Sequence, residues 1–390
     1  MSLNFDSARI SNPLLTPQHE EWRTQIRRFI EREIMPYATE WDEAGEIPEE
    51  LFAKAGAAGV MALGYPEAYG GISEGIDILY HGILYEELAR VGCGGVQSMM
   101  MVHSIGLPPV ANFANEAIKR DVVPGVLDGS KGISLGLTEP GGGSDLANLQ
   151  TTARREGDFY IVNGSKTFIT GGMRASWITT AVRTGGEGPR GVSALLIPTD
   201  TEGVSRTPLD RKQGWWCSDT ATIYFDNVKV PVSNLLGEEN QGFKVVMNNL
   251  NAERINMSIV MEASARVCLE EAVNWAQQRK TFGKRLADHQ VIRHKITEMK
   301  KRINACQATI NHCAREIMEN KPNPADIAML KVMCSETMEF CAREASQILG
   351  GASYLRDNRV ERIYREVRVN AIGGGSEEIL RDLSSRQYGV

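Results

Sequence analysis

The stretch Leu137-Thr138-Glu139-Pro140-Gly141-Gly142-Gly143-Ser144-Asp145 separates a helix-rich first third of the chain from the strand-like segments that follow it. Its consecutive glycines can adopt positive φ and let the backbone approach a ligand closely. Ser144 and the neighbouring N–H groups can hydrogen-bond a phosphate or a flat heterocycle. A Gly-rich turn between two domains has the same composition, so the glycines alone leave both interpretations open.

Composition excludes several classes of protein. A chain of 390 residues is long enough for two or three domains. A net charge of −6 gives no basic surface for nucleic acid or an anionic membrane. No apolar run approaches the ~20 residues of a membrane span, and the N-terminus resembles neither a signal nor a transit peptide, so we expect a cytoplasmic protein. The seven cysteines include no CxxC pair and are expected to be buried reduced thiols.

The order of predicted elements divides the chain into three domains. Residues 1–132 show helical periodicity, beginning with Thr16-Pro17 as a helix start. Residues 133–236 form short strands, with Asn163-Gly164 as a predicted hairpin turn. Residues 237–390 favour long helices over about 242–279, 288–320, 324–349 and 358–370. The fold class is therefore α+β and mainly α, with a helical domain, a β domain and a four-helix region.

Five dispersed motifs share one resemblance. They are Thr138-Glu139-Pro140-x-x-Gly143-Ser144-Asp145, Gly64-x-Pro66-Glu67-x-Tyr69-Gly70-Gly71, Asn163-Gly164-x-Lys166-x-x-Ile169-Thr170-x-Gly172, Arg279-Lys280-Thr281-Phe282-Gly283 followed by Gln290, and Gln347-Ile348-Leu349-Gly350-Gly351. In this order the chain resembles the flavin-dependent acyl-CoA dehydrogenase family over its whole length. The resemblance implies that the middle domain is β-barrel-like, that the C-terminal domain is a four-helix bundle, and that the cofactor is FAD.

The resemblance also implies which residues bind FAD. Within one subunit these are Leu137, Thr138, Gly143, Ser144, Phe168, Ile169 and Thr170. From a neighbouring subunit they are Arg279, Phe282, Gln290, Gln347, Gly350 and Gly351. Ser376 and Glu378, near the C-terminus, are also expected to bind the cofactor. Arg279 suits a pyrophosphate because its guanidinium group can donate two hydrogen bonds at once. The alternative is that Arg279 is a solvated cation at a helix end with no ligand. A cofactor site shared between chains requires an oligomer, and the resemblance implies a homotetramer built as a dimer of dimers.

Acyl-CoA desaturation needs a carboxylate base at Cα and hydrogen bonds to the thioester oxygen. Many family members carry this glutamate in a C-terminal Gly-Glu-Gly-Thr-type stretch, but here Gly374 occupies its position. The isovaleryl-CoA and long-chain members keep the base just before an arginine on the first long C-terminal helix. Asn251-Ala252-Glu253-Arg254 matches that place. We therefore predict Glu253 as the base and Gly374 as an N–H donor to the thioester oxygen.

A physical argument also selects Glu253. At helical spacing it shares a stripe with Val246, Leu250, Met257 and Val260, where a carboxylate is costly unless it is paired or used. A structural pair between Glu253 and an arginine is the alternative. Glu377 and Glu378 are rival bases, and we interpret them as acids at a helix start.

The remaining expectations concern the substrate and its surroundings. The expected substrate contacts are Ser144, Asn251, Arg254, Gln97 and Met101, with the adaptable Met99–Met101 run near the end of the acyl pocket. Trp215-Trp216 either cover the flavin edge or the interface, or belong to the β-domain core. The run Arg356, Arg359, Arg362, Arg365 and Arg368 is expected to be a solvated, salt-bridged helix face. His81, His103 and His289 lack metal-ligand spacing, so no metal is proposed.

The predicted activity is FAD-dependent α,β-dehydrogenation of an acyl-CoA to a trans-2-enoyl-CoA. The expected acyl chain is branched or of medium to long length, and the expected electron acceptor is electron-transferring flavoprotein. Two alternatives remain open. One is an oxidase or monooxygenase of the same fold that uses O2, and the other is a non-catalytic flavoprotein that binds a partner or nucleic acid.

Overall fold

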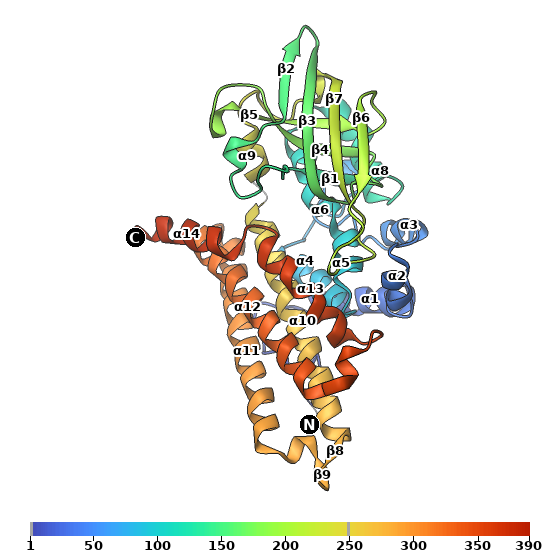
Figure 1. Ribbon diagram of the computed structural model, residues 1–390. Helices are drawn as coiled ribbons and strands as arrows, with labels where there is room; N and C mark the ends of the chain where they lie inside the picture. The colour runs from blue at the N-terminus through green and yellow to red at the C-terminus, as the bar shows by residue number, and fades with distance from the viewer. Residues whose placement is uncertain (1–2, 248–249) are drawn as a thin grey trace.

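The computed structural model describes residues 3–247 and 250–390. A β domain lies at one end of the molecule and the long C-terminal helices extend from it, with the N-terminal helices packed alongside (Figure 1). The N-terminal helices are α1 (Pro17–Glu33), α2 (Ala38–Ala44), α3 (Glu50–Ala57), α4 (Ile78–Ala89), α5 (Gly94–Met101), α6 (His103–Gly106), α7 (Pro108–Phe113) and α8 (Glu116–Leu127). The C-terminal helices are α9 (Gly242–Met247), α10 (Leu250–Gln278), α11 (Gln290–Met318), α12 (Pro324–Leu349), α13 (Arg359–Ile372) and α14 (Glu377–Tyr388).

The middle region is a seven-stranded sheet with the order β1-β4-β2-β3-β7-β6, in which β5 also pairs with β4. Its strands are β1 (Ile133–Gly136), β2 (Thr152–Glu156), β3 (Phe159–Thr170), β4 (Trp177–Arg183), β5 (Val192–Pro198), β6 (Val204–Pro208) and β7 (Thr220–Pro231). A two-stranded hairpin of β8 (Lys280–Thr281) and β9 (Lys284–Arg285) joins α10 to α11. Short 3₁₀ turns lie at Glu67–Tyr69, Leu146–Asn148, Pro189–Gly191, Val232–Asn234, Leu286–Asp288 and Gly350–Tyr354.

Helix α10 is the centre of the helical core. Its buried residues, among them Ile255, Met261 and Leu269, pack with buried residues of α1, α4, α5, α12 and α13 in one cluster. The β domain has a separate core that includes Tyr160, Ile223 and Val230. The expected sequence of helical, β and helical regions is thus confirmed. No helix within residues 3–247 and 250–390 is both long and apolar enough to cross a membrane.

One local prediction was wrong. Asn163-Gly164 is not a hairpin turn: β3 runs through it, and the pairing with β7 shifts register between Val162 and Gly164. Gly164 has φ +142 and leaves no room for a Cβ, which would lie 2.7 Å from the Thr151 Cα. The glycine therefore marks a β-bulge where two backbones approach closely.

Within the predicted helical range 242–279, helix is described over Gly242–Met247 (α9) and Leu250–Gln278 (α10), and positions 248 and 249 lie outside the described residues. Of the predicted stripe, Glu253, Met257 and Val260 lie on α10 and Val246 lies on α9. The last described helix, α14, adds a further element beyond the four predicted ones.

Candidate active site

A buried ion pair fixes the loop after β1. Lys166 Nζ on β3 lies 2.7 Å from Glu139 Oε1, and Lys166 is fully buried. Glu139 also accepts hydrogen bonds from the backbone N–H groups of Gln150 (2.6 Å) and Thr151 (2.9 Å). Burial lowers the pKa of Lys166 to about 8, although Glu139 opposes that shift. The tip of the loop at 141–144 consequently stays exposed while its base is held in place.

Phe168 lies beside this loop in an unusual conformation. Thr167 N–H donates to the Thr138 carbonyl (2.8 Å), so β3 and the loop are in contact. At the next residue φ is +58, and Phe168 is 69% exposed. Positive φ is costly for a bulky residue, and such strain clusters at ligand sites. Ile169 points the other way, into the β-domain core, so only its backbone can contact a cofactor at this surface.

The residues at this surface fit a flavin. Phe168 presents an aromatic face, and a Cβ added at Gly141 or Gly142 would meet nothing within 4 Å, so the loop has an open surface. Thr138 stands against Gly143, whose Cβ position is 3.1 Å from the Thr138 Cγ2. Leu137 is partly buried beneath the loop, and the Thr170 carbonyl accepts a hydrogen bond from Ser134 Oγ (2.8 Å). When bound here, FAD would be held by these residues and would supply a hydride acceptor.

The second group of expected cofactor residues lies far from this surface within one chain. Arg279 follows the end of α10, and Phe282 lies at the tip of the β8–β9 hairpin, at the opposite end of the molecule from the β domain (Figure 1). Gln290 begins α11, and Gln347, Gly350 and Gly351 are exposed where α12 ends. One chain therefore does not bring the two groups together. Ser376 caps α14 by accepting from Ile379 N–H (3.4 Å), and Glu378 is exposed beside it.

The candidate catalytic end is where α10 begins. Glu253 lies in its first turn, and the next residue, Arg254, is buried and donates from Nε to the Gly374 carbonyl (3.4 Å). Burial lowers the pKa of Arg254, and the charge of Glu253 opposes that shift. Glu253 also acts on Tyr85 of α4, whose pKa rises to about 12, chiefly through burial. Glu253 thus lies close enough to two buried groups for its charge to raise their pKa values.

The Gly373-Gly374-Gly375 turn is fixed from two sides. Arg254 holds the Gly374 carbonyl, and Lys331 Nζ of α12 donates to the Gly375 carbonyl (3.0 Å). Gly374 has φ +69, and a Cβ there would lie 2.5 Å from the Sδ of Met257. The side chain of Met257 therefore occupies the space into which a residue at position 374 would project.

The other expected substrate residues fall into two groups. Asn251 Oδ1 accepts from Arg254 Nη1 (3.4 Å), which places it at the catalytic end. Gln97 is half-buried on α5, whereas Met101 is 5% exposed and packs with Met99 and Met100 in the helical core. Ser144 is exposed on the loop after β1.

The rival acids lie where the sequence predicts them. Glu377 and Glu378 are in the first turn of α14, and Ser335 Oγ donates to Glu377 (2.5 Å). Every arginine of the predicted run has an acidic partner: Arg356 with Glu43, Arg359 with Glu270 and Glu271, Arg362 and Arg365 with Asp42, and Arg368 with Glu339. The salt bridges are confirmed, but Arg362 is only 4% exposed. The expectation of a solvated face was therefore wrong there, because Asp42 of α2 packs against α13.

The two tryptophans lie against α13 and not in the β-domain core. Arg356 and Arg365 stack over the Trp216 ring at 4.5 and 3.6 Å, and Trp216 Nε1 donates to the Lys212 carbonyl (3.0 Å). Trp215 N–H donates to Glu366 Oε1 (3.3 Å). Sequence reasoning missed Glu366, a buried carboxyl whose pKa is raised to about 7 by burial. The only sequence feature that marks Glu366 is its position as an acidic residue among the arginines of α13.

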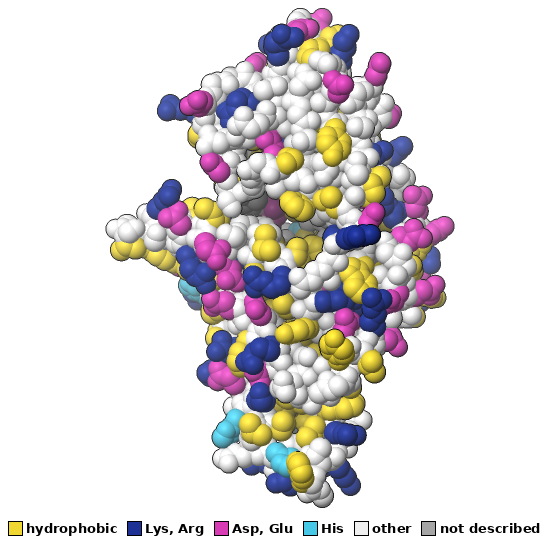
Figure 2. Space-filling view, viewed as in Figure 1, with side chains coloured by type: hydrophobic (Ala, Val, Ile, Leu, Met, Phe, Trp, Pro, Cys, Tyr) yellow, Lys and Arg dark blue, Asp and Glu magenta, His cyan; other side chains and the backbone are white. Residues whose placement is uncertain are grey.

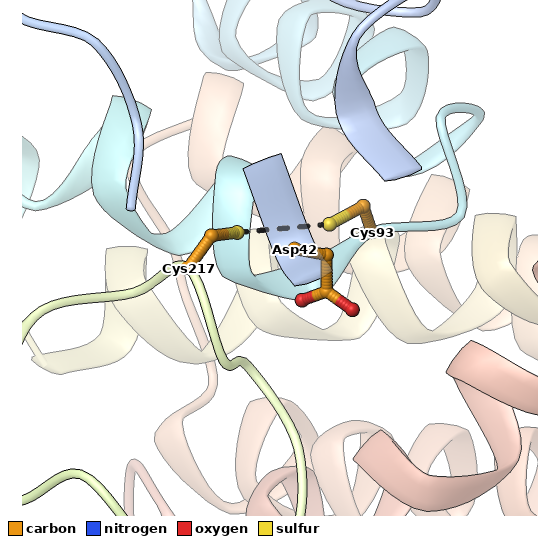
Figure 3. Close-up of side chains that lie close together, drawn as sticks. All are labelled: Asp42, Cys93 and Cys217. Atoms are coloured by element: carbon orange, nitrogen blue, oxygen red, sulfur yellow. Dashed lines mark hydrogen bonds between the residues drawn. The ribbon is translucent and has the colours of Figure 1, made fainter. Parts of the chain in front are cut away.

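All seven cysteines are buried with free thiols, as predicted. The sulfurs of Cys93 and Cys217 point at each other 3.9 Å apart, and Asp42 lies beside them (Figure 3). These groups have the spacing of metal ligands. However, Arg362 and Arg365 already balance the charge of Asp42, so the cluster is accounted for as a packing contact.

Comparison with known proteins identifies the class that this fold and site define. Family models describe the acyl-CoA dehydrogenase N-terminal domain, middle domain and C-terminal domain, and they match residues 16–130, 134–228 and 240–389. The chain therefore belongs to the acyl-CoA dehydrogenase family.

Individual relatives agree with this assignment. The chain is 37% identical to the acyl-CoA dehydrogenase AFT10-1 of Alternaria alternata, over 97% of this chain and 93% of that protein. A probable acyl-CoA dehydrogenase from Mycobacterium abscessus superposes with a TM-score of 0.93 at 40% identity, covering 96% of this chain and 99% of that one. A glutaryl-CoA dehydrogenase from Mycobacterium smegmatis in complex with FADH2 superposes with a TM-score of 0.91 at 26% identity, covering 97% of each chain. The protein is an FAD-dependent oxidoreductase that dehydrogenates acyl-CoA.

Proposed function

We propose that Glu253 is the catalytic base of this reaction and that the substrate is an acyl-CoA of medium to long or branched chain. One observation carries the assignment. The usual place for the family's glutamate is Gly374, and there the side chain of Met257 fills the space that any side chain would need. Glu253 precedes Arg254, which reaches the backbone of that same glycine (3.4 Å). Of the two candidate positions for the base, only Glu253 carries a carboxylate.

In this mechanism the chain holds the thioester and moves one proton. The Gly374 N–H donates to the thioester oxygen, so that negative charge can develop on it. Glu253 removes the proton from Cα, while Arg254 and Lys331 keep the glycine turn in position. FAD, when bound at Thr138 and Phe168, supplies the acceptor for the hydride from Cβ. The product is the trans-2-enoyl-CoA, and the electrons then pass to electron-transferring flavoprotein.

The distribution of exposed apolar side chains supports a homotetramer. Phe282 is 96% exposed, Tyr354 92% and Leu355 68%, and hydrophobic side chains gather over the lower part of the helical bundle (Figure 2). Exposed apolar groups of this size mark interaction surfaces. They lie near the expected cofactor residues Arg279, Gln347 and Gly350, so a second copy would cover them and complete the FAD site.

The test is anaerobic reduction of the bound flavin by a panel of acyl-CoA thioesters of increasing chain length, with isovaleryl-CoA included. Bleaching of the visible flavin absorbance, with a trans-2-enoyl-CoA as product, supports the proposal. Re-oxidation is then compared between electron-transferring flavoprotein and air. Rapid peroxide formation in air would replace the dehydrogenase by an oxidase, and a flavin that no thioester bleaches would reject the proposed substrate class.

A further inference from the structure

A small cavity lies beyond the catalytic end, between α5, α10, α13 and the Trp215 segment. Its polar lining consists of Gln97, Trp215, Ser264, Glu366 and Asn370, and Val260 forms part of its apolar wall. Its volume is about 10 Å³, which is room for roughly one oxygen-sized atom. We call it the distal cavity.

The distal cavity lies along the same face of α10 as Glu253, the proposed base. Glu253, Met257, Val260 and Ser264 recur at steps of four, three and four residues, so they share one face of α10. Met257 contacts Gly374 at one end of this face, and Val260 and Ser264 line the cavity at the other. Helix α13 runs beside α10 in the opposite sense, carrying Asn370 and Glu366 away from Gly374.

The length of this path sets a chain length. At 1.5 Å per residue, Val260 and Ser264 lie about 10 and 16 Å along the axis from Glu253. An extended alkyl chain advances roughly 1.25 Å per carbon, so the path corresponds to about 8 to 13 carbons. An acyl chain of that length, with Cα at Glu253 and following this face of α10, would end at the distal cavity.

The polar groups of the cavity include a donor that nothing described satisfies. Trp215 Nε1 is buried and has no hydrogen-bond partner among residues 3–247 and 250–390. Glu366 is already engaged, because Gly94 N–H donates to its Oε2 (2.9 Å) and Trp215 N–H to its Oε1 (3.3 Å). An orphaned buried donor costs roughly 1–3 kcal/mol. A methyl-terminated chain leaves that donor unpaired, whereas a chain that ends in an oxygen acceptor pairs it.

The donor is also rigidly placed. Trp215 has φ +54, and a Cβ on Gly94 would lie 2.2 Å from its Nε1, so the indole packs directly on that backbone. Two residues on, Cys217 contacts Cys93 through their sulfurs, 3.9 Å apart, and Cys93 caps α5 (Figure 3). The Trp215 segment and α5 are therefore held as one unit, and the N–H cannot turn away to another partner without breaking these contacts.

We propose that Trp215 is a specificity-determining residue whose indole N–H receives a neutral oxygen acceptor, a hydroxyl or a carbonyl, at the far end of a medium-length acyl chain. The inference rests on the proposed function and names its substrate class further. Neutrality follows from Glu366, whose carboxyl group lines the cavity. A carboxylate at the chain end would be repelled there.

The test compares paired substrates. Anaerobic flavin reduction is measured with decanoyl-CoA and with its analogue that carries a terminal hydroxyl, and the ratio of their second-order rate constants is the readout. The wild-type ratio is expected to favour the hydroxylated chain roughly 10-fold or more. Trp215→Phe keeps a ring but removes the N–H, and its ratio is expected to fall to about 1. Octanoyl and dodecanoyl pairs test the length.

Trp216→Phe is the matched control, because its N–H is satisfied by Lys212 and its ring lies outside the cavity. Its ratio is expected to equal that of the wild type. A wild-type ratio of rate constants near 1 overturns the inference even if Trp215→Phe fails to fold. The same ratio in Trp215→Phe and Trp216→Phe also overturns it. If decanoyl-CoA bleaches the flavin while the ratio is 1, the proposed function stands and only this inference falls. If no thioester bleaches it, both fall.

Discussion

Adding a methyl group at Gly374 tests the reason why this position cannot carry the base. Gly374→Ala places a Cβ at φ +69, which costs about 1–2 kcal/mol for an L-residue. The same Cβ lies 2.5 Å from the Sδ of Met257, and displacing that side chain costs about 1–3 kcal/mol more. The expected loss in the free energy of unfolding is therefore about 2–5 kcal/mol.

A double-mutant cycle separates the two contributions. Met257→Ala removes the obstacle, so combining it with Gly374→Ala should recover the steric part, a coupling of about 1–3 kcal/mol, and leave the backbone part. The assay is urea unfolding of the FAD-saturated protein at fixed FAD concentration. Gly373→Ala is the control for the contact with Met257, because φ there is −68 and its Cβ position is 4.0 Å from Met257; its nearest neighbour is the Val369 carbonyl oxygen at 3.2 Å. A Gly374→Ala variant as stable as Gly373→Ala, or a cycle without coupling, would refute the reasoning.

Three further predictions concern the cofactor surface and the core. Phe168→Ala should change the free energy of unfolding by no more than ~0.5 kcal/mol but should weaken FAD binding. Phe159→Ala, which removes another exposed aromatic of β3, should change neither quantity. Thermal unfolding and FAD titration measure the two quantities. Lys166→Met should cost roughly 3 kcal/mol by leaving Glu139 buried without its cation, and urea unfolding should show part of this recovered when Glu139→Gln is added. Burial lowers the pKa of His103 from 6.5 to about 4, so below pH 6.5 only the unfolded chain takes up that proton. The wild type should then lose about 1.4 kcal/mol per pH unit more than His103→Gln down to about pH 4, and parallel pH–stability curves would contradict this.

Features within one continuous segment could be predicted from the sequence. Helical and strand periodicity gave the order of the three regions, and the lack of a CxxC pair predicted the buried, reduced cysteines that the structure has. The exposure of Phe168 could be predicted only from the motif, because a lone strand aromatic is usually in a core. The motif placed it on the surface with Thr138, and the structure does the same.

The errors and omissions come from contacts between distant segments. The sequence Asn163-Gly164 is typical of a turn, yet position 164 is a glycine because the backbone of Thr151 lies too close for a side chain. Arg362 reads as solvated because Asp42, which buries it, is more than 300 residues away in the chain. Met257 reads as a core residue, and its role in filling the space at Gly374 requires the fold.

The same reason hides the distal cavity from sequence reasoning. Gln97, Trp215, Ser264 and Glu366 come from four segments that only the folded chain brings together. No local pattern marks Trp215 as a lining residue, because its neighbour Trp216 has the same residue type and lies outside the cavity.

The most direct test of the central claim is flavin reduction by Glu253→Gln. The variant keeps the size of the side chain and removes the carboxylate that we assign as the base. Wild type, Glu253→Gln and the control Glu377→Gln are mixed anaerobically with the best acyl-CoA of the panel, and the visible flavin absorbance is followed. The account predicts bleaching in the wild type and in Glu377→Gln, with a rate lower by at least ~10³-fold in Glu253→Gln at unchanged FAD content. Equal bleaching in wild type and Glu253→Gln would contradict it.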